Sequence, residues 1–138
     1  MKGQLLLLLF VTIIFSCKKE NDLNDLKNKI SGKWELRQII CGECANPITY
    51  FLQGNGNVIV LSTEGVFERR IDDSITFQGS YVLQRNKECN KATGDIALST
   101  NEGSDPRPLF VQLDADNLQL STPYCYADGA TSIYRRVE

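Results

Sequence analysis

The chain has 138 residues, a net charge of −2 and no histidine. Its acidic and basic residues are mixed along the whole length without a basic stripe, so nucleic acid is not an expected partner. The absence of histidine removes the commonest general base and the commonest metal ligand, which argues against an enzyme and against a metal centre.

The N-terminal segment is an export signal by its composition. Lys2 precedes an apolar run over residues 5–15, which is too short to cross a bilayer of about 30 Å at about 1.5 Å per residue. Ile14, Ser16 and Cys17 resemble a bacterial lipobox. The resemblance implies that residues 1–16 are removed and that Cys17 becomes the lipidated first residue; the alternative is an ordinary secretory signal with an incidental cysteine.

The segment 17–29 is polar and charged, and is expected to tether a domain over residues 30–138 to the membrane. Within it Leu23, Leu26 and Ile30 recur at helical spacing, which predicts either a short helix lying on the domain or a plain linker. In some bacteria, an aspartate after the lipidated cysteine retains a lipoprotein at the inner membrane. This chain has Lys18 there, so the lipoprotein resemblance implies that the protein is anchored in the outer membrane of the bacterial cell envelope.

From Gly32 onward, short strands alternate with turns. The predicted strands cover residues 34–39, 57–61, 66–71, 76–85, 94–100, 109–113, 118–120 and 131–137. No long helix interrupts them, so the pattern favours an antiparallel meander over βαβ units. Eight such strands can close so that the last pairs with the first, which predicts an all-β, eight-stranded up-and-down barrel with a short N-terminal helix.

Gly32 and Trp34 at the start of the first strand resemble the Gly-x-Trp signature of the lipocalin-like (calycin) barrels found in many bacterial lipoproteins. The resemblance implies that a basic residue of the last strand, Arg135 or Arg136, stacks on Trp34 and closes the barrel. It also implies a barrel that holds a small apolar molecule. A core tryptophan of some other β-sandwich is the alternative.

Cys41, Cys44, Cys89 and Cys125 are an even number in an exported chain, so two disulfides are expected. The meander places the end of the first strand near the loop before the last strand. This favours a bridge from Cys41 or Cys44 to Cys125, with Cys89 joined to the remaining cysteine. A local Cys41–Cys44 bridge with Cys89 joined to Cys125 is the main alternative.

Cys41 and Cys44 also form a CxxC pair, the spacing used by thioredoxin-type redox sites and by zinc knuckles. Pro47 follows almost at once, no βαβ frame surrounds the pair, and no second knuckle exists. No redox cofactor and no metal are therefore expected.

The sequence thus predicts a lipid-anchored barrel without enzymatic activity that binds a small apolar ligand. The ligand would lie in the barrel mouth, between residues 41–56 and the loops around Ser104 and Tyr124. The alternative is an interaction protein whose loop aromatic residues grip an envelope protein or a glycan. These aromatic candidates are Tyr50, Phe51, Tyr124 and Tyr126.

Overall fold

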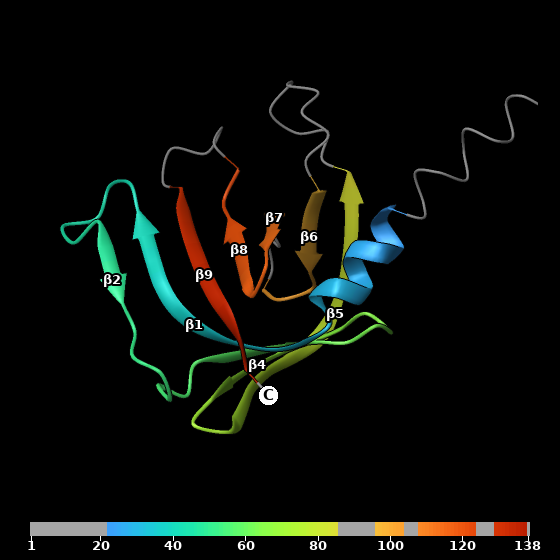
Figure 1. Ribbon diagram of the computed structural model, residues 1–138, viewed down its shortest axis with the longest axis horizontal. Coiled ribbons are helices and arrows are strands. Elements are labelled where there is room, and N and C mark those ends of the chain that lie inside the picture. Colours follow the sequence, from blue (N-terminus) through green and yellow to red (C-terminus); the bar gives the residue numbers. More distant parts are fainter. Residues whose placement is uncertain (1–21, 86–95, 104–107, 124–128, 138) are drawn as a thin grey trace, which may run out of the picture.

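The computed structural model describes residues 22–85, 96–103, 108–123 and 129–137 (Figure 1). The predicted signal segment lies outside these ranges. Seven of the other residues named above also lie outside them: Cys17, Lys18, Cys89, Ser104, Tyr124, Cys125 and Tyr126.

A helix at residues 22–30 precedes a single antiparallel sheet. The strands are β1 (Gly32–Cys41), β2 (Ile48–Tyr50), β3 (Val58–Leu61), β4 (Val66–Ile71), β5 (Ser74–Arg85), β6 (Ile96–Thr100), β7 (Leu109–Asp114), β8 (Asn117–Ser121) and β9 (Ala130–Val137). Each strand from β3 to β9 pairs with the next, and β1 pairs with both β3 and β9. The predicted eight-stranded barrel with a short N-terminal helix is confirmed.

The alternation of apolar and polar residues along each strand decides which side faces the interior. On β8, Leu118 and Leu120 are buried while Gln119 between them faces outward. Strands β3 and β7 follow the same period of two, as expected for a sheet with one buried face. The buried core consists of Ile30, Trp34, Ile59, Leu61, Phe67, Tyr81, Leu98, Leu118 and Leu120.

The helix lies against this core beside β5 (Figure 1). Its Ile30 is fully buried, and the Ile30 carbonyl accepts a hydrogen bond of 2.7 Å from the Trp34 indole nitrogen. Leu26 packs on the same core, and Lys27 Nζ lies 5.7 Å from the centre of the Tyr81 ring. The helical spacing of Leu23, Leu26 and Ile30 therefore predicted a real element, and the plain-linker alternative is wrong for residues 22–30.

The two neighbouring arginines of β9 have different surroundings. Arg136 pairs with Trp34 across the β1–β9 seam, and its guanidinium carbon lies 4.2 Å from the centre of the indole. Its nitrogens also donate to the carbonyl oxygens of Ser31 and Lys29. Arg135 pairs with Glu35 and faces the opposite, outer side. Of the two candidates, Arg136 is the one that stacks on Trp34.

Strand β2 is the one element that the sequence did not predict. Among the described strands its one partner is β1, where Gln38 lies opposite Tyr50 and Ile40 opposite Ile48. Figure 1 shows β2 at the edge of the sheet, beyond β1. The first half of β1 pairs with β3 instead. Strands β2 and β3 therefore lie one after the other along the same edge of β1, and residues 51–57 connect them.

Cys41 and Cys44 form a disulfide, with 5.5 Å between their Cα atoms. The cross-barrel connectivity favoured by the sequence is therefore wrong, and the local alternative holds for this pair. The physical reason is β2: its pairing keeps residues 48–50 on the edge of β1, so the segment does not fold across the barrel as the cross-barrel bridges would need. The expected partner cysteines, Cys89 and Cys125, lie outside the described residues.

Candidate ligand-binding face

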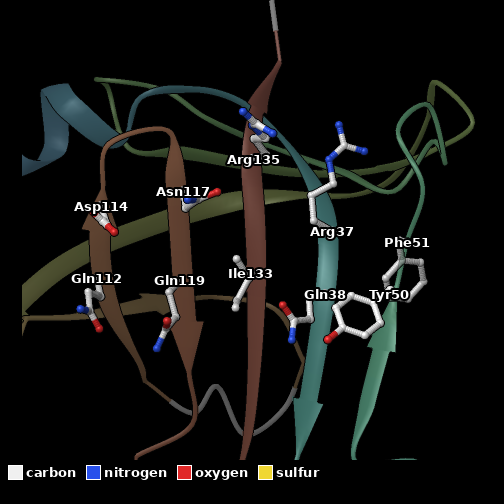
Figure 2. Close-up of a pocket in the computed structure, with 10 residues that line it drawn as sticks. All are labelled: Arg37, Gln38, Tyr50, Phe51, Gln112, Asp114, Asn117, Gln119, Ile133 and Arg135. Atoms are coloured by element: carbon white, nitrogen blue, oxygen red, sulfur yellow. The ribbon is translucent and has the colours of Figure 1, made fainter.

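A large hollow lined by described residues lies on the outside of the barrel, not within it. It has a volume of about 570 Å³ and crosses β7, β8, β9, β1 and β2 (Figure 2). We call it the outer hollow. Its lining residues are Arg37, Gln38, Tyr50, Phe51, Gln112, Asp114, Asn117, Gln119, Ile133 and Arg135.

One row of side chains runs straight across five strands of this face. The register places Gln112 opposite Gln119, Gln119 opposite Ile133, Ile133 opposite Gln38, and Gln38 opposite Tyr50. We call these residues the glutamine row. Directly opposed residues of neighbouring strands have Cβ atoms about 4.5–5.5 Å apart, so the row is a continuous band with three amides, one isoleucine and a terminal tyrosine.

A second row lies beside the first and carries the charges. It runs from Asp114 through Asn117 and Arg135 to Glu35. Figure 2 shows Asp114, Asn117, Arg135 and Arg37 together along one side of the outer hollow. Glu35 is only 4 % exposed although its position in the strand faces outward. Its carboxylate pairs with Arg37 at 2.6 Å, so it carries no free charge into the hollow.

The segment after β2 forms the wall of the outer hollow next to Tyr50 and Phe51. The Phe51 amide donates to the Arg37 carbonyl at 2.8 Å, and the Arg37 guanidinium donates to the Leu52 carbonyl at 3.0 Å. Asn55 adds hydrogen bonds from its side-chain nitrogen to the carbonyl oxygens of Leu36 and Leu52. These bonds hold the backbone that carries Tyr50 and Phe51 beside β1.

Most polar groups of the outer hollow are left without a protein partner. Gln119 donates to the Ser121 hydroxyl at 3.1 Å, and Arg37 binds the Glu35 carboxylate and the Leu52 carbonyl. Six polar side chains have no hydrogen-bond or ion-pair partner among the described residues: Gln38, Tyr50, Gln112, Asp114, Asn117 and Arg135. A ligand could therefore bind them without first breaking bonds within the protein.

A smaller hollow of about 250 Å³ extends the outer hollow beyond β8. It shares Gln112 and Gln119 with the outer hollow and adds Phe110 and Ser121. The extended face thus has aromatic side chains at both ends, Tyr50 and Phe51 on the β2 side and Phe110 on the β7 side.

A smaller hollow lies among inward-facing residues of the barrel. Leu36, Ile59, Arg69 and Tyr134 are among the residues lining an interior cavity of about 90 Å³. Arg69 forms an ion pair of 2.7 Å with Glu102. Burial raises the pKa of the Tyr134 phenol, against a smaller opposite effect of the Arg69 charge.

Two of the four predicted aromatic residues, Tyr50 and Phe51, line the outer hollow; Tyr50 belongs to strand β2 and not to a loop. Tyr124 and Tyr126 lie outside the described residues. Sequence reasoning missed the glutamines of three separate strands. The signal that could have found them is the alternation along the strands: Gln112 and Gln119 each lie between two apolar residues, which predicts that both glutamines face outward.

Comparisons of the chain with protein-family models, with curated proteins and with solved structures returned no match. Within the described ranges, no group of three or more cysteine or acidic side chains is placed to hold a metal ion. In the same ranges, the model has no helix with the length and apolar character to cross a membrane.

Proposed function

We propose that this protein is a lipid-anchored, non-enzymatic saccharide-binding protein of the bacterial cell envelope. The observation that carries the proposal is the glutamine row, an ordered band of amide groups that ends at the aromatic ring of Tyr50. Lipidation of Cys17 would hold the barrel at the membrane, where envelope and extracellular glycans are in reach.

The chemistry of the row suits a polyhydroxylated ligand. A side-chain amide both donates and accepts hydrogen bonds, as a sugar hydroxyl does. In Gln38 and Gln112, neither the oxygen nor the nitrogen of the side-chain amide has a hydrogen-bond partner among the described residues. Gln119 uses its nitrogen to bond Ser121, and its oxygen stays available to a ligand. An open, polar hollow would leave an apolar ligand largely in water, whereas a saccharide keeps its hydration on the exposed side.

The aromatic residues supply the apolar part of sugar recognition. Tyr50 is 74 % exposed, so its ring is available to pack on the C–H face of a sugar. The face from β2 to β7 covers four strand spacings, about 19 Å at about 4.8 Å each. That span fits a linear oligosaccharide of several rings lying across the strands, with Phe110 near its far end.

The small apolar ligand implied by the lipocalin-like resemblance stays a prediction. The described interior offers it about 90 Å³ beside the charged pair Arg69 and Glu102. Ligand pockets usually have about 300–1,000 Å³. The outer hollow, with about 570 Å³, therefore supports a binding function better.

An envelope protein is the second candidate ligand, favoured by exposed apolar side chains next to the hollow. Ile48 is 45 % and Leu52 87 % exposed, and the outer edge of β2 pairs with no strand in the described part of the chain. A partner could add an extended strand to that free edge. If so, Ile48→Ser and Leu52→Ser would weaken its binding, and Gln119→Ala would not.

The test is a screen of the full chain, in mild detergent, against a glycan array, followed by calorimetry with the oligosaccharides that bind. Tyr50→Ala and Gln119→Ala are expected to weaken binding about two- to tenfold each, the range of one hydrogen bond or one packed ring. Gln78→Ala, an exposed glutamine on β5 away from the hollow, is the matched control. Absence of saccharide binding by the wild type would contradict the proposal. Mass spectrometry of the same sample tests acylation at Cys17.

A further inference from the structure

Arg135 differs from the other arginines of the described structure in having no partner. Arg37, Arg69, Arg70 and Arg85 each pair with a carboxylate, and Arg136 is held by Trp34 and two backbone carbonyls. The Arg135 guanidinium has no ion pair and no hydrogen bond to any described residue. It is exposed, and it lines the outer hollow.

The neighbouring acidic residues do not neutralise Arg135. Glu35 lies opposite it on β1, but Arg37 occupies the Glu35 carboxylate at 2.6 Å. Asp114 is on β7, separated from β9 by the whole of β8, which is about 9–10 Å at two strand spacings. Asn117, between them, is uncharged. Around Arg135 the hollow therefore carries a positive charge that no described residue pairs, beside the glutamine row, while the unpaired negative charge of Asp114 lies beyond β8 (Figure 2).

We infer that the ligand is an acidic saccharide, whose carboxylate pairs with Arg135 while its hydroxyls bind the glutamine row. This inference rests on the proposed function and names its substrate class. The planar guanidinium fork matches a carboxylate with two parallel hydrogen bonds. Sugars of the uronic and sialic acid type carry such a group on the ring, so one molecule can reach both rows.

The experiment is calorimetry with the full chain in mild detergent, using trigalacturonic acid and sialyllactose, each compared with its methyl ester. Esterification removes the charge and leaves the hydroxyls in place. At least one acid is expected to bind about tenfold or more tightly than its ester, the low end for a charge-assisted pair. In Arg135→Gln the preference disappears while the ester keeps its affinity. Arg135→Lys keeps part of the preference, because the charge remains but the fork is lost.

Arg70→Gln on β4 is the matched control, because it removes the same charge from a strand that does not line the hollow. Thermal melting of each variant verifies that the barrel is folded. Equal binding of acid and ester overturns the acidic inference and leaves saccharide binding intact. A preference that survives Arg135→Gln also overturns the inference. Binding of neither acid nor ester, together with no binding on the glycan array, overturns the proposed function as well.

Discussion

Arg136 of β9 lies over the indole of Trp34 on β1, with 4.2 Å between the guanidinium carbon and the ring centre. The two residues are opposite each other in the pairing that closes the barrel. Because Arg136 also donates to the carbonyls of Lys29, in the helix, and of Ser31, between the helix and β1, it links the last strand to both. One side chain thus joins the barrel seam to the helix that covers the core.

Arg136→Ala is expected to lower the free energy of unfolding by about 2 kcal/mol, from the lost cation–π contact and the lost charged hydrogen bonds at a partly exposed site. Urea denaturation with the Cys41–Cys44 disulfide intact measures this loss. Arg135→Ala is the matched control, and a change within about 0.5 kcal/mol is expected there because Arg135 has no described partner. Equal losses for both variants would contradict the role given to the Trp34–Arg136 pair.

Gly32→Ala tests the same closure from the backbone. Gly32 has φ of 137°, and a Cβ there would lie 2.6 Å from Arg136 Nη1. The substitution therefore strains the backbone and displaces the arginine, at an expected cost of about 2–3 kcal/mol. In the Arg136→Ala background the clash is gone, so the same substitution is expected to cost less. Simple addition of the two losses would argue against the contact.

Removing the Cys41–Cys44 disulfide is expected to loosen the β1–β2 hairpin. Of the strands that the structure describes, β2 pairs with β1 alone, so it can open without unfolding the barrel. In Cys41→Ala/Cys44→Ala, the Phe51 amide, bonded to the Arg37 carbonyl, is expected to exchange about five- to thirtyfold faster, since a short-loop disulfide is worth about 1–2 kcal/mol. Amides in the β8–β9 ladder serve as the internal control; equal acceleration there would contradict a local effect.

Stability is expected to fall at alkaline pH, partly because of Tyr134. Burial raises the pKa of its phenol in the folded state, whereas in the unfolded chain the phenol ionises near pH 10. The stabilisation is therefore complete below about pH 10 and is lost as the pH rises toward the folded pKa. In Tyr134→Phe, the urea midpoint of denaturation should therefore fall less steeply between pH 9 and pH 11 than in the parent protein. Both proteins are measured in the Cys41→Ala/Cys44→Ala background. An unchanged slope would show that other groups cause the decline.

The fold could be read largely from the sequence because its signal is local. Leu118, Gln119 and Leu120 show the period of two directly, and Gly65 at φ of 91° supplies the turn expected between β3 and β4. Strand β2 could not be predicted, since three residues after Pro47 are too few to show alternation. Without β2, nothing in the sequence indicated that the segment after Cys44 stays on the edge of β1, and the disulfide prediction failed for that reason.

The outer hollow could be predicted only in part. Tyr50 and Phe51 stood out as aromatic residues in a polar segment. Gln38, Gln119 and Gln112 lie far apart in the chain, and an outward glutamine on any one strand is ordinary. They become a row only when the barrel closes and sets the register of β7, β8, β9 and β1. That register depends on long-range pairing and on the irregularity between Leu36 and Gln38, which has no clear sequence signature.

The central claim is that the ligand binds outside the barrel, and nitrogen-15 NMR mapping of the full chain during titration with an oligosaccharide from the array tests it most directly. The predicted result is that the side-chain amide signals of Gln38, Gln112, Gln119 and Asn117 shift together, while the Trp34 indole signal, from the buried core, stays in place. Shifts centred on Trp34 and the backbone around Leu36 and Tyr134, with the glutamine amides unchanged, would contradict the claim and place the ligand inside the barrel.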